Sequence, residues 1–249
     1  MLDLMPETPS YNVIACIPIH GRIPLFVHTI KRLLERNGVS RVICVGDKDE
    51  DRAVVRLLGD RVEWVQHVND PLGAKWNAAF RAAAVHSPDA VLFVGSSDWV
   101  SDQWVPIGMK HLEKYDMVGR LDNHLLDIDR THGYRVCHWA GYTNERKGEC
   151  IGIGRMLRRS ILEKINYTPF NPTFNVSMDK CMHEAVIANG GRVLAMKDPD
   201  AFSLGLSTDR WVNKHNFNDH WEQRIPSAIN PSPMAFLSTN FPEAFQIFS

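Results

Sequence analysis

The sequence predicts a single α/β domain whose twisted, mainly parallel sheet is covered by helices on both faces. Short apolar runs rich in β-branched residues alternate, through residues 12–118, with stretches whose apolar residues recur at helical spacing. Strand, helix and strand in succession form a βαβ unit with a parallel strand pair. At 249 residues the chain is long enough to bury one sizeable core, so we expect one domain.

The first half of the chain supplies the regular elements. The run NVIACIPI is typical of a buried strand and stops at His20-Gly21-Arg22. After it, Pro24 suits a first helical turn and Asn37-Gly38 suits a C-terminal cap. The same reasoning predicts, in order, strand 12–19, helix 24–37, strand 41–47, helix 49–58, strand 61–65, helix 74–86 and strand 90–94.

The second half is less regular. Residues 120–150 carry acids and histidines without clear periodicity, and a loop of that length in a compact domain is usually functional or mobile. Beyond it we expect helices at 159–165 and 180–188 and a strand at 192–196. The tail after Ser207 is rich in Trp, Asn, His and Pro, and we expect it to wrap over the functional site.

Composition argues against several function classes. The net charge of -1 gives no overall attraction to nucleic acid or to anionic membranes. A local basic groove is compatible with this net charge. The five cysteines are odd in number and lack CxxC pairing, which predicts reduced thiols and a cytoplasmic location. The first residues do not resemble a signal peptide, and no apolar run approaches the ~20 residues of a membrane span. We expect a soluble protein without a membrane partner.

Polar residues follow three of the predicted strands. His20 and Arg22 follow the first strand, Asp47 closes the second, and Asp98 follows the fourth. Ligands of open α/β sheets bind outside the carboxyl ends of the strands. We therefore expect these four side chains to converge on one edge of the sheet.

Asp98 lies in a turn of small residues, Gly95-Ser96-Ser97, after the fourth strand. A carboxylate at such a strand end is suited to Mg²⁺ or Mn²⁺, because these ions prefer oxygen ligands and complete their shell with substrate phosphates. The alternative is a structural role in which Asp98 caps the turn or the next helix.

Six segments form an ordered series along residues 12–200: IPIHGRIPLFVHTIKRLL, VGD, PLGAKWNAAFRAA, FVGSSDW, GIGRMLRRSIL and NVSMDKCM. In this order and spacing they resemble family-2-like glycosyltransferases with the GT-A fold, a Rossmann-like arrangement. The resemblance implies a nucleotide-sugar-binding half at 12–118, an acceptor half at 119–206 and a C-terminal wrap at 207–249.

The resemblance also implies a donor site. Asp47 matches the acid that hydrogen-bonds the nucleotide base, usually uracil, while Pro18 and His20 match the strand end lining that pocket; a turn acid is the alternative for Asp47. Lys75 and Asn77 match a basic-then-asparagine pair near the ribose and phosphates, with a solvated helix face as the alternative. The expected donor residues also include Arg22, Ser97, Asp98, Gly154 and Lys214.

The resemblance further implies a metal ion. Asp98 matches the last acid of an Asp-x-Asp motif, the acid that usually touches the metal, but Ser96 replaces the first acid and Ser97 fills the middle. Because serine supplies no charge, metal binding becomes weaker or more dependent on the donor pyrophosphate. We expect Mn²⁺ or Mg²⁺ held by Asp98 and His215, with His220 as the alternative histidine.

Asp179 matches the catalytic base that opens a helix in these enzymes, with Met178 where a glutamate is common. Its structural alternative is a helix N-cap, a role worth ~1 kcal/mol. Gly152 and Gly154 match a segment that lets backbone approach donor and acceptor; turn geometry alone is the alternative.

The expected reaction is a single, inverting displacement in which Asp179 removes the proton of an acceptor hydroxyl. Two other functions stay open. A sugar nucleotidyltransferase would show a glycine- and arginine-rich loop after the first strand, where this chain has only His20-Gly21-Arg22. A non-catalytic nucleotide-sugar or glycan-binding module is favoured by Ser96 and disfavoured by the presence of both Asp98 and Asp179.

The acceptor is the least constrained part of the hypothesis. Compact chains of this kind resemble those of bacteriophages, some of which glycosylate hydroxymethylated bases in DNA. Basic residues in and around the expected helix 159–165, together with one at the start of the strand 192–196, are candidates for contacts with DNA phosphates. The alternative is a solvated basic helix face. These residues are Arg155, Arg158, Arg159, Lys164 and Arg192.

Overall fold

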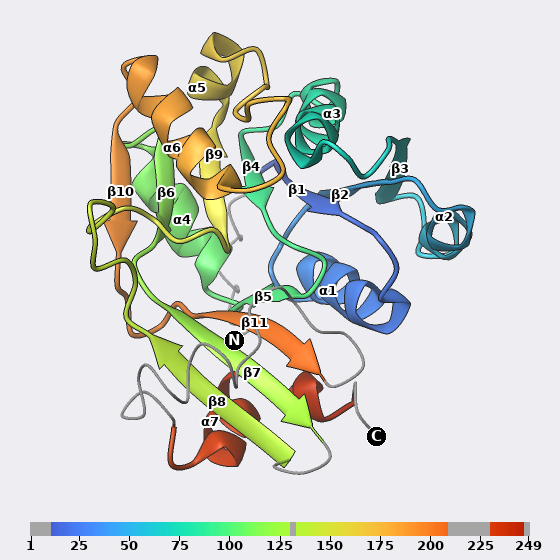
Figure 1. Cartoon of the computed structure of the whole chain (residues 1–249), viewed down its shortest axis with the longest axis vertical. Coiled ribbons are helices and arrows are strands. Elements are labelled where there is room, and N and C mark those ends of the chain that lie inside the picture. Colours follow the sequence, from blue (N-terminus) through green and yellow to red (C-terminus); the bar gives the residue numbers. More distant parts are fainter. Residues whose placement is uncertain (1–10, 130–132, 209–229, 247–249) are drawn as a thin grey trace, which may run out of the picture.

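The computed structural model describes residues 11–129, 133–208 and 230–246, and in this part of the chain the strands form two sheets (Figure 1). The larger sheet has seven strands in the order β10-β6-β9-β4-β1-β2-β3, and the smaller has four in the order β5-β11-β7-β8. All neighbours in the larger sheet are parallel except β9, which runs antiparallel to β4 and β6. The predicted α/β fold with a mainly parallel sheet is confirmed.

The seven elements predicted for the first half are all present, and their ends lie within two residues of the predicted ones. Apolar periodicity is a reliable guide here because each strand of a buried parallel sheet is apolar on both faces. The elements are β1 (Val13–Pro18), α1 (Ile23–Glu35), β2 (Arg41–Gly46), α2 (Asp49–Arg56), β3 (Val62–Gln66), α3 (Leu72–Ala84) and β4 (Ala90–Phe93).

The second half departs from the prediction at residues 120–150. Where a long loop is expected, the structure has a hairpin of two strands that pair from Asn123↔Trp139 to Asp129↔Gly133. The strand pattern is hidden because charged residues occupy buried positions: Nη2 of Arg135 lies 2.5 Å from Oδ2 of Asp127. The loop prediction is therefore wrong.

The predicted helices at 159–165 and 180–188 and the strand at 192–196 are confirmed. The elements after β4 are β5 (Asp98–Val100), α4 (Trp104–Leu112), β6 (Met117–Arg120), β7 (Asn123–Asp129), β8 (Gly133–Trp139), β9 (Arg155–Arg158), α5 (Arg159–Lys164), α6 (Met178–Ala188), β10 (Val193–Met196), β11 (Ser203–Thr208), α7 (Pro233–Asn240) and the 3-10 helix η3 (Pro242–Gln246).

Three apolar clusters hold these layers together. On one face of the larger sheet, buried residues of α1 and α4 pack around Phe26 and Trp104. On the other face, α3, α5 and α6 pack around Phe80 and Met182. The third cluster joins the smaller sheet to α7 and η3, which lie together in the lower part of Figure 1. Helices thus cover both faces of the larger sheet, as predicted.

All five cysteines are buried and unpaired, as predicted. In the described part of the chain, no helix is both long enough and apolar enough to cross a membrane. The described end of the expected wrap, α7 and η3, packs on the smaller sheet, whereas residues 209–229 lie outside the described residues.

Candidate active site at the carboxyl edge of the sheet

The ends of β1 and β2 bring His20 and Asp47 together. Pro18, the last residue of β1, pairs with Val45 of β2, so the residues after both strands leave the sheet side by side. Nδ1 of His20 lies 3.2 Å from Oδ1 of Asp47. Partial desolvation raises the pKa of Asp47, but the hydrogen bond and charge of His20 and the charge of Lys75 bring it below its ordinary value. The predicted base-binding residues thus form a preformed contact on the surface.

Lys75 lies beneath this pair and is completely buried. Helix α3 directs its Nζ to the backbone oxygen of Ile19, 2.6 Å away, and to Oδ1 of Asn69, 2.9 Å away. Burial lowers the pKa of Lys75 to about 8, against the opposing effect of Asp47 and Asp51. The alternative of a solvated helix face is therefore wrong for Lys75, and its role in donor binding stays a prediction.

Arg22 lies beside the turn after β4. Its Nη2 donates to Oγ of Ser96 at 3.1 Å and its Nη1 donates to Oγ of Ser97 at 3.4 Å. Its backbone is in the left-handed region, with φ 59°, at the start of α1. The preceding residue, Gly21, donates its N–H to Oδ2 of buried Asp51 at 2.7 Å. The structure therefore joins Arg22 and Ser97, two of the predicted donor residues.

Asp98 opens β5 and folds back over its own turn. Its Oδ2 accepts the Gly95 N–H at 3.0 Å, and a Cβ on Gly95 would lie only 2.4 Å from that oxygen. Burial raises the pKa of Asp98 to about 6, against the opposing effects of the Gly95 N–H and the Arg22 charge. The turn-capping role expected as the alternative is present, and the role as metal ligand stays a prediction.

The described residues around Asp98 do not fit a divalent cation by themselves. They offer one carboxylate, of which one oxygen is already used by Gly95, and two hydroxyls that face the guanidinium of Arg22. Among residues 11–129, 133–208 and 230–246 no three His, Cys, Asp or Glu side chains are grouped to hold a metal. His215, His220 and Lys214 lie outside the described residues.

Two predicted donor residues have structural partners instead. Both ends of the Asn77 amide are bonded to the backbone of Phe170, at 2.8 and 3.1 Å, so the structure does not bring Asn77 to the strand ends. Gly154 donates its N–H to the oxygen of Phe93 at 3.0 Å and has φ +79°, and a Cβ there would contact Val100 and Trp104. Gly154 thereby holds its segment against the end of β4.

Asp179 lies in the first turn of α6, next to the same segment: a Cβ on Gly152 would lie 3.8 Å from the Asp179 Cβ. Its Oδ2 accepts hydrogen bonds from the Tyr142 hydroxyl and, at 2.6 Å, from Nη2 of Arg146. Burial raises the pKa of Asp179, but Tyr142, Arg155 and Arg146 bring it below its ordinary value. The helix N-cap is Ser177, so Asp179 is not the N-cap; its place in the first turn agrees with the favourable dipole interaction expected in that alternative.

Sequence reasoning missed several residues of this site. Tyr142 and Arg146 hold Asp179 from a segment without helical or strand periodicity, and their partner is 37 and 33 residues away in the chain. Asp51 positions the Gly21 backbone from the first turn of α2. In the sequence it is one of three acids at the start of this helix, a common pattern that indicates no contact with Gly21. No local signal in the sequence identifies these contacts.

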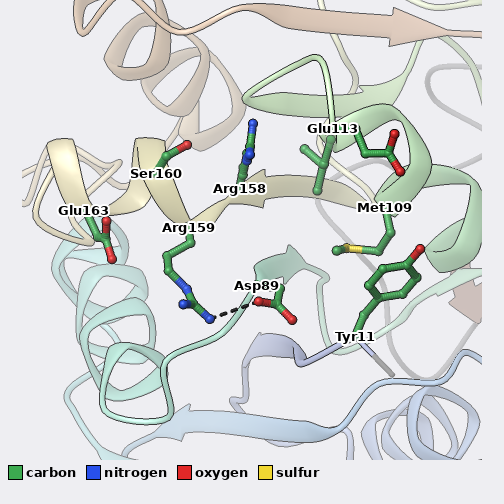
Figure 2. A pocket seen from close by; sticks show the side chains of 9 residues that line it. Tyr11, Asp89, Met109, Glu113, Arg158, Arg159, Ser160 and Glu163 are labelled. Atoms are coloured by element: carbon green, nitrogen blue, oxygen red, sulfur yellow. Dashed lines mark hydrogen bonds and ion pairs between the residues drawn. The ribbon is translucent and has the colours of Figure 1, made fainter. Parts of the chain in front are cut away.

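A hollow on the described surface lies at the other edge of the sheet (Figure 2). It has a volume of about 530 Å³ and is lined by residues beside the start of β4 and the end of β9, including Arg158 and Glu113, and Arg159 is paired with Asp89 across it at 3.0 Å. A second hollow of about 340 Å³ lies at the end of β6, lined by Arg120, His124 and neighbouring residues. Only the second lies on the carboxyl edge.

One of the basic residues expected to face DNA does not reach the surface. Arg155 is fully buried, with Nε donating to the oxygen of Ile151 at 2.8 Å and the two Nη groups bound to Cys150 and Asp179. It therefore organises the Asp179 segment and cannot contact a phosphate on the surface. Arg158, Lys164 and Arg192 are exposed.

Comparison with known proteins identifies the fold. No protein-family model and no curated protein matches the chain by sequence. Among solved structures, the chain is similar to S. aureus TarS 1-349, with a TM-score of 0.55 and 13% sequence identity; the match covers 78% of this chain and 60% of the TarS chain. The chain thus spans less than two thirds of the length of this neighbour, and the likeness shows that its fold is GT-A-like.

Proposed function

We propose that this protein is a glycosyltransferase that moves a sugar from a nucleotide-sugar, a UDP-sugar, to a hydroxyl acceptor. TarS, whose fold it shares, is a GT-A-type glycosyltransferase. The observation that carries the proposal is the convergence of His20, Asp47, Arg22 and Lys75 at the carboxyl ends of β1 and β2. This edge is where open α/β sheets bind nucleotides.

In the proposed complex the donor base lies over the end of β2. The carboxylate of Asp47, oriented by His20, accepts a hydrogen bond from a base N–H. The charges of Arg22 and Lys75 favour the diphosphate beside them. In this arrangement the Gly152–Gly154 segment, which is next to Asp179, lies between the donor and Asp179.

The proposed chemistry is one inverting displacement. The acceptor oxygen attacks the anomeric carbon and forms the new C–O bond, while the bond from that carbon to the phosphate oxygen breaks and the nucleoside diphosphate leaves. Oδ1 or Oδ2 of Asp179 takes the acceptor proton, a contribution typically of ~10²–10⁴-fold in rate. Tyr142 and Arg146 orient this carboxylate and keep it ionised. The roles of Mn²⁺ or Mg²⁺, Asp98 and His215 stay predictions, and no step above depends on them.

The donor is tested by thermal unfolding in the presence of UDP-, GDP-, ADP-, CDP- and TDP-sugars. A ligand that binds only the folded state stabilises it in proportion to its affinity, so UDP-sugars should raise the midpoint most. A nucleotidyltransferase would instead consume a nucleoside triphosphate and release pyrophosphate. A protein that shows neither transfer nor donor-dependent stabilisation is not a glycosyltransferase.

The acceptor proposal is a hydroxymethylated base in bacteriophage DNA. Arg158, Lys164 and Arg192 are exposed, but Arg158 lines the hollow at the opposite edge of the sheet and Arg192 precedes β10, so these residues do not carry the proposal. Incubation of hydroxymethylated DNA with donor and protein should add hexose or pentose mass, and DNA affinity should fall with salt because binding releases counterions. Transfer only to glycans or lipids would reject DNA as acceptor and leave the glycosyltransferase proposal intact.

A further inference from the structure

The turn Ser96-Ser97-Asp98, which replaces the Asp-x-Asp motif, already has a cation beside it. The Arg22 guanidinium contacts Ser96 at 3.1 Å and Ser97 at 3.4 Å, and its charge acts on Asp98. In the motif that the resemblance implies, this is where a divalent ion would neutralise the donor diphosphate. A second cation placed here would be repelled by Arg22.

The two serines form a rigid support for the guanidinium. Both are only 2% exposed. The backbone oxygen of Ser96 accepts the Thr29 hydroxyl at 3.4 Å, and that of Ser97 accepts the Leu206 N–H from the smaller sheet at 2.8 Å. The backbone of both serines is therefore held between α1 and β11, which positions their hydroxyls beside Arg22.

Serine hydroxyls locate a guanidinium without cancelling its charge. An aspartate at either position would form an ion pair with Arg22, whereas a neutral hydroxyl only accepts a hydrogen bond. Two of the five N–H groups of the guanidinium are used in this way, and the other three have no acceptor within the described residues. A planar fork with free donors matches the geometry of phosphate oxygens.

The backbone at Arg22 is also held in an uncommon conformation. Gly21 and Arg22 have φ of 70° and 59°, and the Gly21 N–H is bonded to Asp51. A non-glycine residue with positive φ is uncommon, and such residues cluster at ligand-binding sites where the surroundings enforce them. Asp51 is fully buried, so the loop that presents Arg22 is fixed before any ligand binds.

We propose that the Arg22 guanidinium, positioned by Ser96 and Ser97, is the cation that binds the donor diphosphate and neutralises the departing nucleoside diphosphate, in place of a divalent metal. This inference rests on the proposed function. It assigns the two serines a role in phosphate binding and makes donor binding independent of Mn²⁺ and Mg²⁺. If Arg22 only held α1 to the turn Ser96-Ser97-Asp98, its substitution would lower the stability of the fold and leave the affinity for the donor unchanged.

The test measures binding of UDP and of uridine by calorimetry, in EDTA and in Mn²⁺, to the full chain. Wild type should bind UDP in EDTA within about threefold of its affinity in Mn²⁺, and Arg22→Gln should weaken UDP binding in EDTA by at least about tenfold, as expected for a lost charge-assisted contact. Uridine, which lacks the diphosphate, should bind both proteins equally. Arg22→Lys keeps the charge without the fork and should fall between them, and Arg56→Gln, an exposed arginine of α2, should match wild type.

Each outcome decides between explanations. UDP binding that appears only when Mn²⁺ is added to wild type overturns the inference and leaves the donor proposal standing. Equal UDP affinity of wild type and Arg22→Gln in EDTA also overturns it. If UDP, GDP, ADP, CDP and TDP all fail to bind in either condition, the proposed function itself fails, and the inference fails with it. Should Arg22→Gln not fold, the wild-type comparison in EDTA and the Arg22→Lys variant still decide.

Discussion

The two sides of the candidate site are held in place by different forces. On the donor side, His20, Asp47 and Asp98 follow the ends of strands whose own residues are apolar and buried. On the other side, the chain relies on polar contacts such as Arg120 with Asp122 and Arg146 with Asp179. The donor-side residues are therefore placed by buried apolar strands. The Asp179 carboxylate, by contrast, is oriented by polar partners, and removal of one partner leaves the other uncompensated.

This difference explains why one side is more readily predicted than the other. Hydrophobic burial depends on periodic patterns that are local in the sequence. An ion pair between residues 33 positions apart, as for Arg146 and Asp179, has no local signature. Substitutions on both sides should therefore differ in their effects on stability, donor affinity and turnover.

The largest effect is expected at Asp122, on the polar side. Nη2 of Arg120 lies 2.5 Å from Oδ1 of Asp122 and His138 lies 3.0 Å from Oδ2, and Arg120 is nearly fully buried. Asp122→Asn leaves the buried guanidinium without its carboxylate, so the free energy of unfolding should fall by about 3–5 kcal/mol in denaturant titrations.

The stability contributed by Asp122 should also depend on pH. Burial raises the pKa of Asp122, but His138 and Arg120 bring it below its ordinary value of 3.8. A depressed folded pKa contributes stability that is present above the unfolded pKa and is lost as pH falls through the folded pKa. The variant and wild type should therefore converge in stability in acid. A loss below about 1 kcal/mol at pH 7 would show that the polar side does not depend on this pair.

Asp179→Asn should lower turnover by at least ~10²-fold, about 2.7 kcal/mol of transition-state stabilisation, because an amide cannot take the acceptor proton. Donor affinity should stay within a few fold, since the lost interaction belongs to the transition state. Asp60→Asn, at an exposed acid of the turn before β3, is the matched control and should retain activity, whereas Asp200 is the next candidate for the base. If Asp179→Asn folds, binds donor and turns over within a few fold of wild type, Asp179 is not the base.

Gly95→Ala tests the donor-side turn. The added Cβ would lie 2.4 Å from Oδ2 of Asp98, so the carboxylate has to move and donor affinity should fall by about tenfold, or about 1.4 kcal/mol. Gly38→Ala is the control: its φ of +69° strains an alanine, but no atom lies within 4 Å of the new Cβ. The control should lose stability and keep donor affinity. Equal donor affinity of Gly95→Ala and wild type would show that the turn tolerates displacement of Asp98.

Lys75 makes donor binding depend on pH. Its pKa of about 8 predicts that the ammonium charge is lost as pH rises through 8, and donor affinity should fall about three- to fivefold between pH 7 and 9.5, the effect of roughly 1 kcal/mol for one nearby charge. Folding stability should change in the opposite direction. Between the folded pKa of about 8 and the ordinary value of 10.5 the unfolded state binds more protons, so stability rises with pH. Lys75→Met should abolish the pH dependence of both donor affinity and folding stability. If either dependence persists in this variant, it arises from another titratable group.

The smallest effect is expected at an exposed ion pair. Lys180 and Glu184 lie four residues apart on α6, 3.8 Å from each other, with side chains 48% and 62% exposed. Glu184→Gln should change the free energy of unfolding by no more than about 0.5 kcal/mol, because solvent and salt screen such pairs. Comparison with Asp122→Asn then separates the effect of burial from that of charge alone.

Apolar patterns along the chain were enough to predict the α/β class, the first seven elements to within two residues, and the strand ends at which His20, Arg22, Asp47 and Asp98 lie. The hairpin within residues 120–150, the burial of Lys75 and Arg155, and the contact of Arg22 with Ser96 and Ser97 became evident from the folded chain alone. The reason is physical. Apolar periodicity reports the face that a single element buries, whereas a charged side chain is buried only when a partner from elsewhere in the chain compensates it.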